Sequence, residues 1–378
     1  MLALPEAEKQ VRGLLYTPSE IAQQPATWQK TYRLFESSRT EVQRFLRQAR
    51  DDRWMIYLVG AGTSDYIGHA IANLLRRSWN CEVCAVASTD LLTNRDDLVL
   101  ADRDYLWISF SRSGDSPEGV AVLEQALESS PRVRHLVVSC NRDGRMVKLA
   151  QESRHSLAVL LDDAVNDRSL AMTSSFTNMV VFGQALANLW DGDHFKKTLD
   201  SMTLAAEYLL GEGAELAHDL AKRGYSRACF VGSGGLGAAA RESALKLLEL
   251  TSGHIQTMYE TTLGLRHGPM SSLNSETLFT AFLSSGDKRR RYDADLLNEV
   301  RAKQVVRTIV TVGGTAASDY GLHCPAFERI DDAYKPAVDV IFSQMLGLFS
   351  SIQLGMQPDS PSPTGLISRV VEKFAIYA

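Results

Sequence analysis

Short apolar runs alternate with helix-like segments along most of the chain. In the first half, largely apolar runs cover residues 55–59 (MIYLV), 82–86 (EVCAV), 105–110 (YLWISF) and 133–138 (VRHLVV), with helical patterns over about 63–79 and 116–128. Apolar runs without a regular alternation of polar side chains are typical of parallel strands that are buried on both faces. The pattern therefore predicts an α/β fold in which helices cover both faces of a parallel sheet.

The order of these segments repeats later in the chain. The interval from Phe110 of FSRSGD to Phe282 of FLSSGD is the same as the interval from Gly60 to Gly232. A third run, TIVT, follows its counterpart LVVS at this interval too. Three matches in register without a gap indicate that the α/β domain is duplicated within the chain.

Length and composition fit two globular domains. We expect an N-terminal helical segment over residues 1–40, a first domain over 41–200 and a second domain over 201–378. Hydrophobic residues make up 45% and charged residues 22% of the chain, which is enough to bury a sizeable core. The net charge is -5 and the only basic run is short, at 288–291, so we expect no nucleic-acid partner. The sequence shows neither a signal peptide nor an apolar stretch of bilayer-spanning length, so we expect a cytoplasmic protein without a membrane partner.

The cysteines do not predict a metal site. Cys81 and Cys84 have CxxC spacing, but they lie inside a strand-like run and no second CxxC pair accompanies them. We interpret them as small buried side chains in a reducing compartment. Because no group of histidines and carboxylates has ligand spacing, we expect neither a metal nor another cofactor.

Two polar loops follow apolar runs of the first half. GAGTS extends from Gly60 to Ser64, and SRSGDSPE extends from Ser111 to Glu118. Ligands of open parallel sheets bind at the carboxyl ends of the strands, so we expect both loops on one rim. In the second loop, Ser116 suits the N-cap of the following helix, and the proline after it suits the first helical position.

The SRSGDSPE loop combines several groups that bind anions. Ser111, Ser113 and Ser116 supply hydroxyls, Arg112 supplies a cation, and Gly114 permits a tight turn. Free N–H groups at the start of the following helix favour a negative charge. The set suits a phosphate monoester, although a capped helix with a polar loop explains the same residues.

The duplicated copy of the loop favours the phosphate interpretation. Leu283 and Lys288 stand where the first copy has Ser111 and Ser116, and Ser285 alone keeps a hydroxyl. One copy has therefore retained the hydroxyls that the other has lost. We expect one phosphate site per chain, in the first half.

A dinucleotide site is an alternative for the second half. Gly232, Gly234 and Gly237 satisfy G-x-G-x-x-G between a strand and a helix, and Glu260 lies about where an acid could bind a ribose. The first-half loop has Asp65 in place of the third glycine, so the duplicated ancestor need not have bound a nucleotide. The helix that follows is also long for this motif and carries a charged face.

That charged face contains candidate acid–base residues. Glu242, Lys246 and Glu249 lie at i, i+4 and i+7, so they share one side of the helix. On an isolated helix they would be weak surface pairs, but a carboxylate beside a lysine at a ligand rim can act as a base near neutral pH. Among the eight histidines, His267 has the strongest claim to proton transfer, because it lies in a turn near the same rim.

Together these motifs resemble a known family. GAGTS, SRSGDSPE, ESALKLLE and HGP occur in the order and spacing of a tandem pair of sugar isomerase (SIS) domains, over roughly residues 40–370. The chain is similar to the isomerase part of glucosamine-6-phosphate synthase. ETTLGLRHGP and PDSPSPTGLISRVV look closer still to the galactosamine-6-phosphate deaminase/isomerase family, also labelled tagatose-6-phosphate ketose/aldose isomerases. The resemblance implies two flavodoxin-like parallel sheets, each covered by helices on both faces.

The resemblance also implies roles for individual residues. Glu249 would move a proton between C1 and C2, Glu242 and Lys246 would orient it or bind sugar hydroxyls, and His267 would open the sugar ring. In related synthases that histidine reaches the site of the partner subunit, which implies a homodimer with shared sites. Binding of the sugar phosphate is implied for Gly62, Ser64, Ser111, Arg112, Ser113, Ser116, Thr173 and Arg369.

Two departures from the synthase pattern affect the predicted reaction. Arg369 replaces a lysine at the sugar site, and arginine is a poor proton carrier. Residue 2 is leucine and no glutamine-hydrolysing domain precedes the repeat in this sequence, so we expect no ammonia from glutamine and favour the deaminating direction. The hypothesis is conversion of galactosamine 6-phosphate to tagatose 6-phosphate and ammonia. The alternatives are plain ketose/aldose isomerisation of tagatose 6-phosphate, deamination of glucosamine 6-phosphate, and a non-catalytic sugar-phosphate sensor.

Overall fold

The computed structural model describes residues 1–47, 54–191, 194–362 and 364–377. The chain forms two compact units, each assembled from separated stretches of sequence, whereas the sequence pattern suggested continuous ranges. The first-sheet unit comprises Thr27–Asn166, Ser174–Phe195 and Ser368–Ala378. The second-sheet unit comprises Met1–Ala26, Asp167–Thr173 and Lys196–Ile367.

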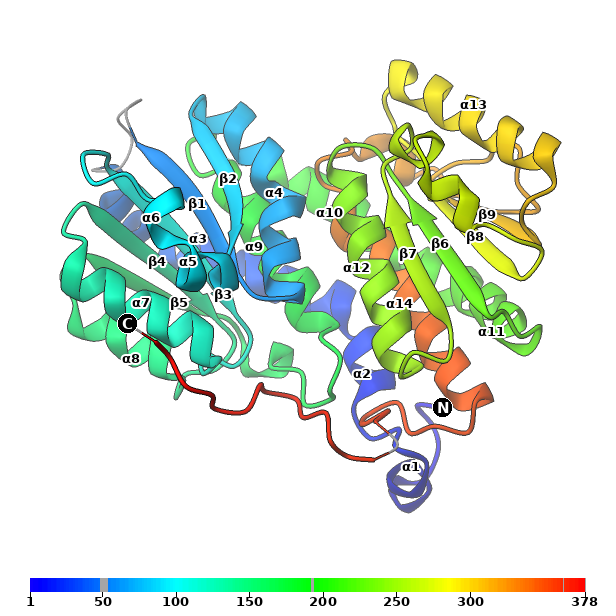
Figure 1. Ribbon diagram of the computed structural model, residues 1–378, viewed down its shortest axis with the longest axis horizontal. Helices are drawn as coiled ribbons and strands as arrows, with labels where there is room; N and C mark the ends of the chain where they lie inside the picture. The colour runs from blue at the N-terminus through cyan, green and yellow to red at the C-terminus, as the bar shows by residue number, and fades with distance from the viewer. Residues whose placement is uncertain (48–53, 192–193, 363, 378) are drawn as a thin grey trace. The chain divides into compact units, whose positions relative to one another are not determined.

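The first-sheet unit contains five parallel strands in the order β2-β1-β3-β4-β5 (Figure 1). They are β1 (Met55–Gly60), β2 (Glu82–Ala87), β3 (Tyr105–Ser111), β4 (Val133–Ser139) and β5 (Ser156–Leu160). The apolar runs of β1, β3 and β4 form strands that are buried along most of their length, and every residue of β3 is buried. The edge strands β2 and β5 are partly exposed. The order 2-1-3-4-5 is that of flavodoxin-like sheets, which confirms the expected topology.

Helices cover both faces of this first sheet. On one face, Leu58 of β1 packs against Gly68 of α4 (Thr63–Trp79), and α4 packs in turn against α9 (Ser174–Ala187). On the other face, Tyr57 and Trp107 belong to an apolar cluster with α5 (Ser88–Thr93) and α7 (Pro117–Ser129). Adjacent residues of β1 thus face opposite layers, as the period of two in a strand requires. The remaining helices are α3 (Gln24–Leu46), α6 (Arg95–Leu98) and α8 (Arg145–Glu152).

The second-sheet unit repeats the same topology. Its parallel strands lie in the order β7-β6-β8-β9-β10, which is again 2-1-3-4-5. They are β6 (Arg227–Val231), β7 (Gln256–Glu260), β8 (Thr277–Phe282), β9 (Thr308–Val312) and β10 (Tyr320–Leu322). The duplication inferred from the constant spacing of the sequence matches is therefore present in the fold.

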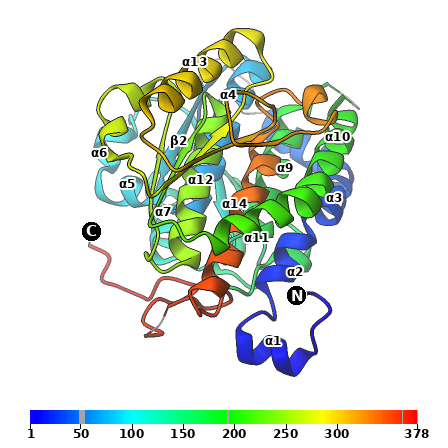
Figure 2. The same cartoon turned by 90° about the vertical axis from the view of Figure 1, so that its right-hand side faces the viewer.

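Helices also cover both faces of the second sheet. α12 (Gly235–Leu250) and α14 (Pro336–Gln353) run side by side on one face, with α11 (Ala214–Lys222) against α14 (Figures 1 and 2). α13 (Asp287–Lys303) covers the other face through an apolar cluster that includes Phe279, Leu296 and Leu297. The other helices of this unit are α1 (Glu6–Arg12), α2 (Thr17–Ala22), most of α10 (His194–Tyr208) and the π-helical turn η3 (Leu209–Gly213).

The glycine loops after β1 and β6 have the same backbone conformation. Gly62 precedes α4 with φ 55° and ψ -125°, and Gly234 precedes α12 with φ 59° and ψ -126°. Positive φ values of this kind favour glycine over residues with a Cβ atom. These two positions are separated by the same interval as Gly60 and Gly232, so the repeat extends to the backbone of the turn.

No helix in the described part of the chain is long and apolar enough to cross a membrane.

Candidate active site

The SRSGDSPE loop leaves the carboxyl end of β3 and leads into α7. Ser111 Oγ accepts a hydrogen bond from Gly114 N at 3.0 Å, and Ser113 Oγ accepts one from Asp115 N at 3.2 Å. Gly114 has φ 67°, so the turn requires its conformational freedom. Two serine hydroxyls thus lie in the turn that immediately precedes a 13-residue helix.

Ser116 lies at the N-cap position of α7, with the expected proline at the first helical position. The expected N-cap position is therefore confirmed, although the Ser116 side chain forms no capping hydrogen bond. Its backbone carbonyl instead accepts the bond from Val120 N at 3.0 Å. The Ser116 hydroxyl therefore leaves the N–H groups of the first helical turn uncapped. An anion site at a helix start requires such uncapped N–H groups.

Arg112 connects the loop to the C-terminal stretch. Its buried guanidinium donates to the carbonyl oxygen of Arg369 at 2.6 Å, and Arg369 donates to Asn166 Oδ1 at 2.6 Å. The structure thus brings together two residues that are 257 positions apart. Asn166 was not singled out in the sequence, because a lone asparagine after a loop carries no signal of its partner.

The GAGTS loop lies beside the SRSGDSPE loop because β1 and β3 are neighbours in the sheet. Gly62 supplies the turn, and Ser64 lies buried in the first turn of α4. Two helix starts, those of α4 and α7, therefore meet the same edge of the first sheet. The residues predicted to bind phosphate on these two loops therefore follow neighbouring strands of one sheet.

Thr173 belongs to the second-sheet unit and is fully buried. Its backbone N–H donates to Asp167 Oδ2 at 2.7 Å, within the short stretch Asp167–Thr173. Glu20 of α2 accepts hydrogen bonds from the Arg168 N–H at 2.5 Å and from the hydroxyl of Ser169. Burial, reinforced by the nearby Asp167 carboxylate, raises the pKa of Glu20 to about 7. Two carboxylates therefore hold the stretch that ends at Thr173.

The charged face of α12 is a buried ion-pair cluster. Lys246 Nζ lies 3.4 Å from Glu242 Oε1 and 2.5 Å from Glu249 Oε2. The side chains of Lys246 and Glu242 are 0% exposed, whereas that of Glu249 is 28% exposed. Weak surface pairs are therefore excluded as an explanation of this face. Of the three residues, Glu249 is the one that solvent or a ligand can reach.

His267 lies in the second-sheet unit at the end of the 3₁₀ turn η4 (Gly264–Arg266) and is exposed. Its neighbour Arg266 contacts Glu299 of α13, with Nε and Oε2 2.6 Å apart, and the preceding Thr262 donates to Asp293 Oδ1 at 2.9 Å. α13 thus holds the segment that carries His267. In the described residues, no hydrogen bond or ion pair joins His267 to the charged residues of α12.

The alternative nucleotide and metal sites gain no support. Glu260 accepts hydrogen bonds from Thr261 N at 2.6 Å and Thr261 Oγ1 at 3.2 Å, so it is engaged in its own turn. Cys81 and Cys84 are free thiols at half-buried positions, and burial raises the pKa of Cys81. Within the ranges that the structure describes, no group of three or more His, Cys, Asp or Glu side chains could hold a metal ion.

The predicted site residues therefore form two groups. Most phosphate-binding candidates lie at the end of β3, in the loops that follow β1 and β3, or at the start of α4, and Arg369 lies in the C-terminal stretch of the same first-sheet unit. The acid–base candidates and Thr173 lie in the second-sheet unit.

Comparisons with known proteins give one family model and relatives that match almost the full length of the chain. The model of the SIS domain family matches residues 50–189. The chain is 36% identical over 373 residues to a putative D-galactosamine-6-phosphate deaminase AgaS of Streptomyces coelicolor, covering 96% of both chains. It is 35% identical over 372 residues to the D-galactosamine-6-phosphate deaminase AgaS of Escherichia coli, covering 96% of this chain and 95% of that protein.

Solved structures show the same fold over 92–100% of the chain. A putative tagatose-6-phosphate ketose/aldose isomerase of Clostridium novyi superposes with a TM-score of 0.95 at 31% identity, covering 100% of this chain and 99% of that one. The tagatose-6-phosphate ketose/aldose isomerase of Escherichia coli superposes with a TM-score of 0.83 at 34% identity, covering 92% and 95%.

Proposed function

The chain belongs to the SIS-domain family of D-galactosamine-6-phosphate deaminases and tagatose-6-phosphate isomerases, and from that premise we propose that it converts galactosamine 6-phosphate to tagatose 6-phosphate and ammonia. The enzyme class, an aminosugar-phosphate deaminase or isomerase, is that of the family. The observation that carries the proposal is the buried Glu242–Lys246–Glu249 cluster, in which one carboxylate alone is open to a ligand.

The SRSGDSPE loop binds the phosphate group. The hydroxyls of Ser111, Ser113 and Ser116 and the N–H groups at the start of α7 are donors for its oxygens. Arg112 adds a cation whose position is fixed by its bond to the Arg369 carbonyl. Anchoring the phosphate fixes the position of the sugar carbons, and such positioning can contribute about 7 kcal/mol or more to catalysis.

Glu249 moves the proton between the sugar carbons. Once the ring is open, its carboxylate removes the proton from C2 while the C1 carbonyl oxygen takes up a proton, which gives an enolamine. The carboxylate then returns its proton to C1 while the amine releases one, which gives a ketimine. Water then adds to C2 and ammonia leaves, so that the ketose remains. Lys246 holds the Glu249 carboxylate at 2.5 Å, and Glu242 holds Lys246 from the buried side.

His267 assists opening of the pyranose ring. An imidazole can donate a proton to the ring oxygen and accept one from the C1 hydroxyl near neutral pH. The exposure of His267 supports this role, because a substrate can reach the ring nitrogens. Arg266 and Thr262 tie the segment to α13 and limit its movement.

The test is to incubate the protein with galactosamine 6-phosphate, glucosamine 6-phosphate and tagatose 6-phosphate, measuring ammonia and ketose separately. We expect ammonia and ketose in equal amounts from the galacto substrate. A Glu249→Gln variant is expected to lose hydrogen exchange at C2 while it still binds sugar phosphate. Glu215→Gln, on the exposed side of α11, is the matched control. Exchange that persists in Glu249→Gln would show that another group is the base.

Plain isomerisation is a second candidate function. It is favoured by the solved Escherichia coli relative, which is described as a tagatose-6-phosphate ketose/aldose isomerase. In the same assay this function gives aldose from tagatose 6-phosphate and no ammonia from either amino sugar. Turnover of glucosamine 6-phosphate alone would assign the gluco substrate. Tight binding of one of the three sugar phosphates, without turnover of any, would indicate that the protein is a sugar-phosphate sensor.

We propose further that the enzyme is a homodimer in which His267 completes the site of the partner subunit. Mixing an inactive Glu249→Gln variant with an inactive His267→Ala variant tests this arrangement. If sites are shared, subunit exchange places an intact Glu249 and an intact His267 in one site and restores activity. If each site is built within one chain, the mixture stays inactive.

A further inference from the structure

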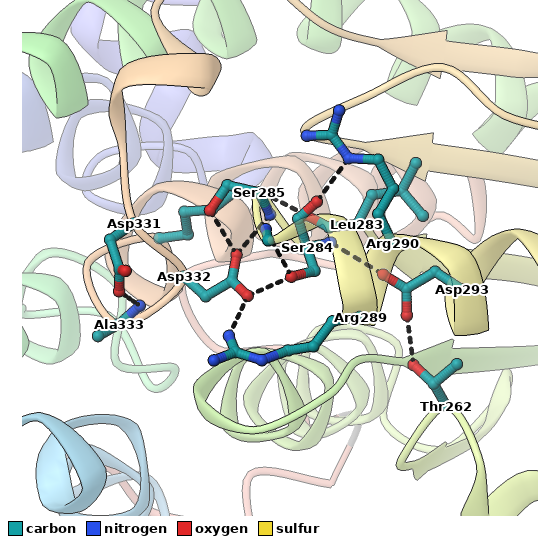
Figure 3. Close-up of polar contacts among 12 residues, drawn as sticks. Thr262, Leu283, Ser284, Ser285, Arg289, Arg290, Asp293, Asp331, Asp332 and Ala333 are labelled. Carbon is teal, nitrogen blue, oxygen red and sulfur yellow. Dashed lines mark hydrogen bonds and ion pairs between the residues drawn. The ribbon is translucent and has the colours of Figure 1, made fainter.

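The second copy of the phosphate loop contains a carboxylate of the chain itself. The segment Ser284–Asp287 follows β8 as the SRSGDSPE loop follows β3, and the side chain of Asp332 points into it (Figure 3). Asp332 comes from the stretch before α14, 47 residues along the chain from Ser285. It is only 3% exposed.

Several donors converge on this one carboxylate. Asp332 Oδ1 accepts hydrogen bonds from Ser285 N at 2.6 Å and from Ser285 Oγ at 2.8 Å. Asp332 Oδ2 accepts hydrogen bonds from the hydroxyl of Ser284 and from the guanidinium of Arg289. A backbone N–H, two hydroxyls and an arginine at a helix start are the donors that a phosphate group binds in proteins.

The charge of Asp332 is compensated. Burial alone would raise the pKa of this carboxyl, but the hydrogen bonds from Ser284 and Ser285, together with the Lys335 ammonium, lower it below the ordinary value. Asp332 is therefore an anion throughout the neutral range. The carboxylate of Asp332 thus supplies the loop with the negative charge that a bound anion would supply.

The first copy of the loop differs in the partners of its serine hydroxyls. Among the described residues, no carboxylate accepts a hydrogen bond from the hydroxyls of Ser111, Ser113 or Ser116. The two loops also differ in their turn, because Gly114 has φ 67° whereas Gly286 has φ -83°. The second loop has thus been rebuilt around an internal anion, while the hydroxyls of the first remain directed to other groups.

Contacts other than those of Asp332 also hold the second loop. Arg290 Nε donates to Ser284 O at 2.9 Å, and Ser284 N donates to Asp293 Oδ2 at 2.9 Å. The ammonium of Lys335 donates to Leu283 O. These bonds are independent of the Asp332 side chain. The donors of the loop should therefore keep their places when the carboxylate is removed.

We propose that the segment Ser284–Asp287 with Arg289 is an anion-binding site whose ligand is the chain's own Asp332, and that a phosphate group binds there when this carboxylate is removed. An internal carboxylate at this position agrees with the expectation of one phosphate site per chain. The Arg289 side chain is 53% exposed, so an anion from solvent can reach the position. The proposal rests on the proposed function only for the choice of phosphate as the anion.

The test uses the full-length protein and inorganic phosphate. Asp332→Ala and Asp332→Ser open the position, Asp332→Asn keeps it filled with a neutral amide, and Asp331→Ala, at the adjacent position, is the control. Thermal unfolding midpoints are measured in phosphate and in chloride of equal ionic strength, and bound phosphate is counted by calorimetry. We expect phosphate to raise the unfolding midpoint of the two opened variants more than that of the wild type. We also expect these variants to bind one more phosphate per chain. Asp332→Asn and Asp331→Ala should behave as the wild type does.

Opened variants that bind no additional phosphate would overturn the proposal. If Asp332→Ala is recovered unfolded, refolding from urea in phosphate and in chloride replaces the melting experiment. Recovery of the native fold in phosphate alone supports the proposal, and failure in both salts overturns it. A failure here leaves the sugar-phosphate assays of the wild type unaffected, because those depend on the first loop.

Discussion

Removal of the buried lysine of α12 tests whether the acid–base cluster is an interdependent unit. The perturbation is Lys246→Met, which keeps the length of the side chain and removes its charge. In the wild type, Lys246 lies 3.4 Å from Glu242, and both side chains are 0% exposed. Without the ammonium, the carboxylate of Glu242 remains in the protein interior and loses the charge of Lys246.

The expected loss of stability follows from burial. Breaking a buried ion pair by removing one partner costs about 3–5 kcal/mol, because the remaining charge cannot return to water. The chain contains a matched exposed pair, Lys222 and Asp219, at the same distance of 3.4 Å, with side chains 51% and 64% exposed. Lys222→Met should cost less than about 1 kcal/mol, because solvent screens the exposed pair.

The assay is urea unfolding of three variants at neutral pH. Lys246→Met should lose about 3–5 kcal/mol of unfolding free energy. The double variant Glu242→Leu with Lys246→Met should return to within about 1 kcal/mol of the wild type or exceed it, since both charges are gone. Both variants should lose turnover.

Two results would refute this reasoning. One is a Lys246→Met variant that is no less stable than Lys222→Met, which would mean that burial does not decide the cost. The other is a double variant as unstable as the single one, which would mean that lost packing, and not the charge of Glu242, causes the loss.

Three further predictions follow from buried or tethering groups. Burial raises the pKa of Asp339 from 3.8 to about 7, so the folded chain holds this proton more tightly than the unfolded chain between those values. As the pH rises from about 4 to 7, the unfolding free energy of the wild type should therefore fall relative to that of Asp339→Asn, by up to about 1.4 kcal/mol per pH unit in urea unfolding. Equal pH dependence of the two proteins would contradict this. Asp359 accepts hydrogen bonds from the N–H and hydroxyl of Thr17 at 2.8 Å, so Asp359→Ala should cost about 1–3 kcal/mol in thermal unfolding; an unchanged midpoint would speak against it. Glu299→Gln removes the ion pair with Arg266 that holds the segment of His267. This variant should have a kcat lowered by up to about 100-fold, with little change in KM for the sugar phosphate. A change confined to KM would assign Glu299 to binding.

The elements and their repetition could be predicted from the sequence because they depend on local pattern. The apolar run at 105–110 became β3 (Tyr105–Ser111), and the helical pattern at 63–79 became α4 (Thr63–Trp79). The constant interval between matching segments predicted two equivalent sheets, and both have the same strand order. The shared helix face of Glu242, Lys246 and Glu249 also follows from helical periodicity alone.

The sequence could not show how deeply that face is buried. An i, i+4 pair of opposite charge has the same spacing on a surface helix and inside a protein. α14 packs alongside α12 and helps to enclose the pair, although several strands and α13 separate the two helices along the chain. Ser116 takes the expected N-cap position, but its hydroxyl forms no capping hydrogen bond, because residue type permits such a bond without determining where the hydroxyl points.

The sequence by itself determined the fold class, the duplication and the residue types of the candidate site. Only the tertiary structure decided which groups meet. Arg112 binds the carbonyl of Arg369, Glu20 holds the stretch before Thr173, and Asp332 fills the second loop. Hydrophobic patterns that repeat every two or 3.6 residues indicate which side of a strand or helix is buried. They do not indicate which residue, tens to hundreds of positions away, contacts that side. Such partners are selected when the strands and helices pack, because a buried polar group must then find a hydrogen bond.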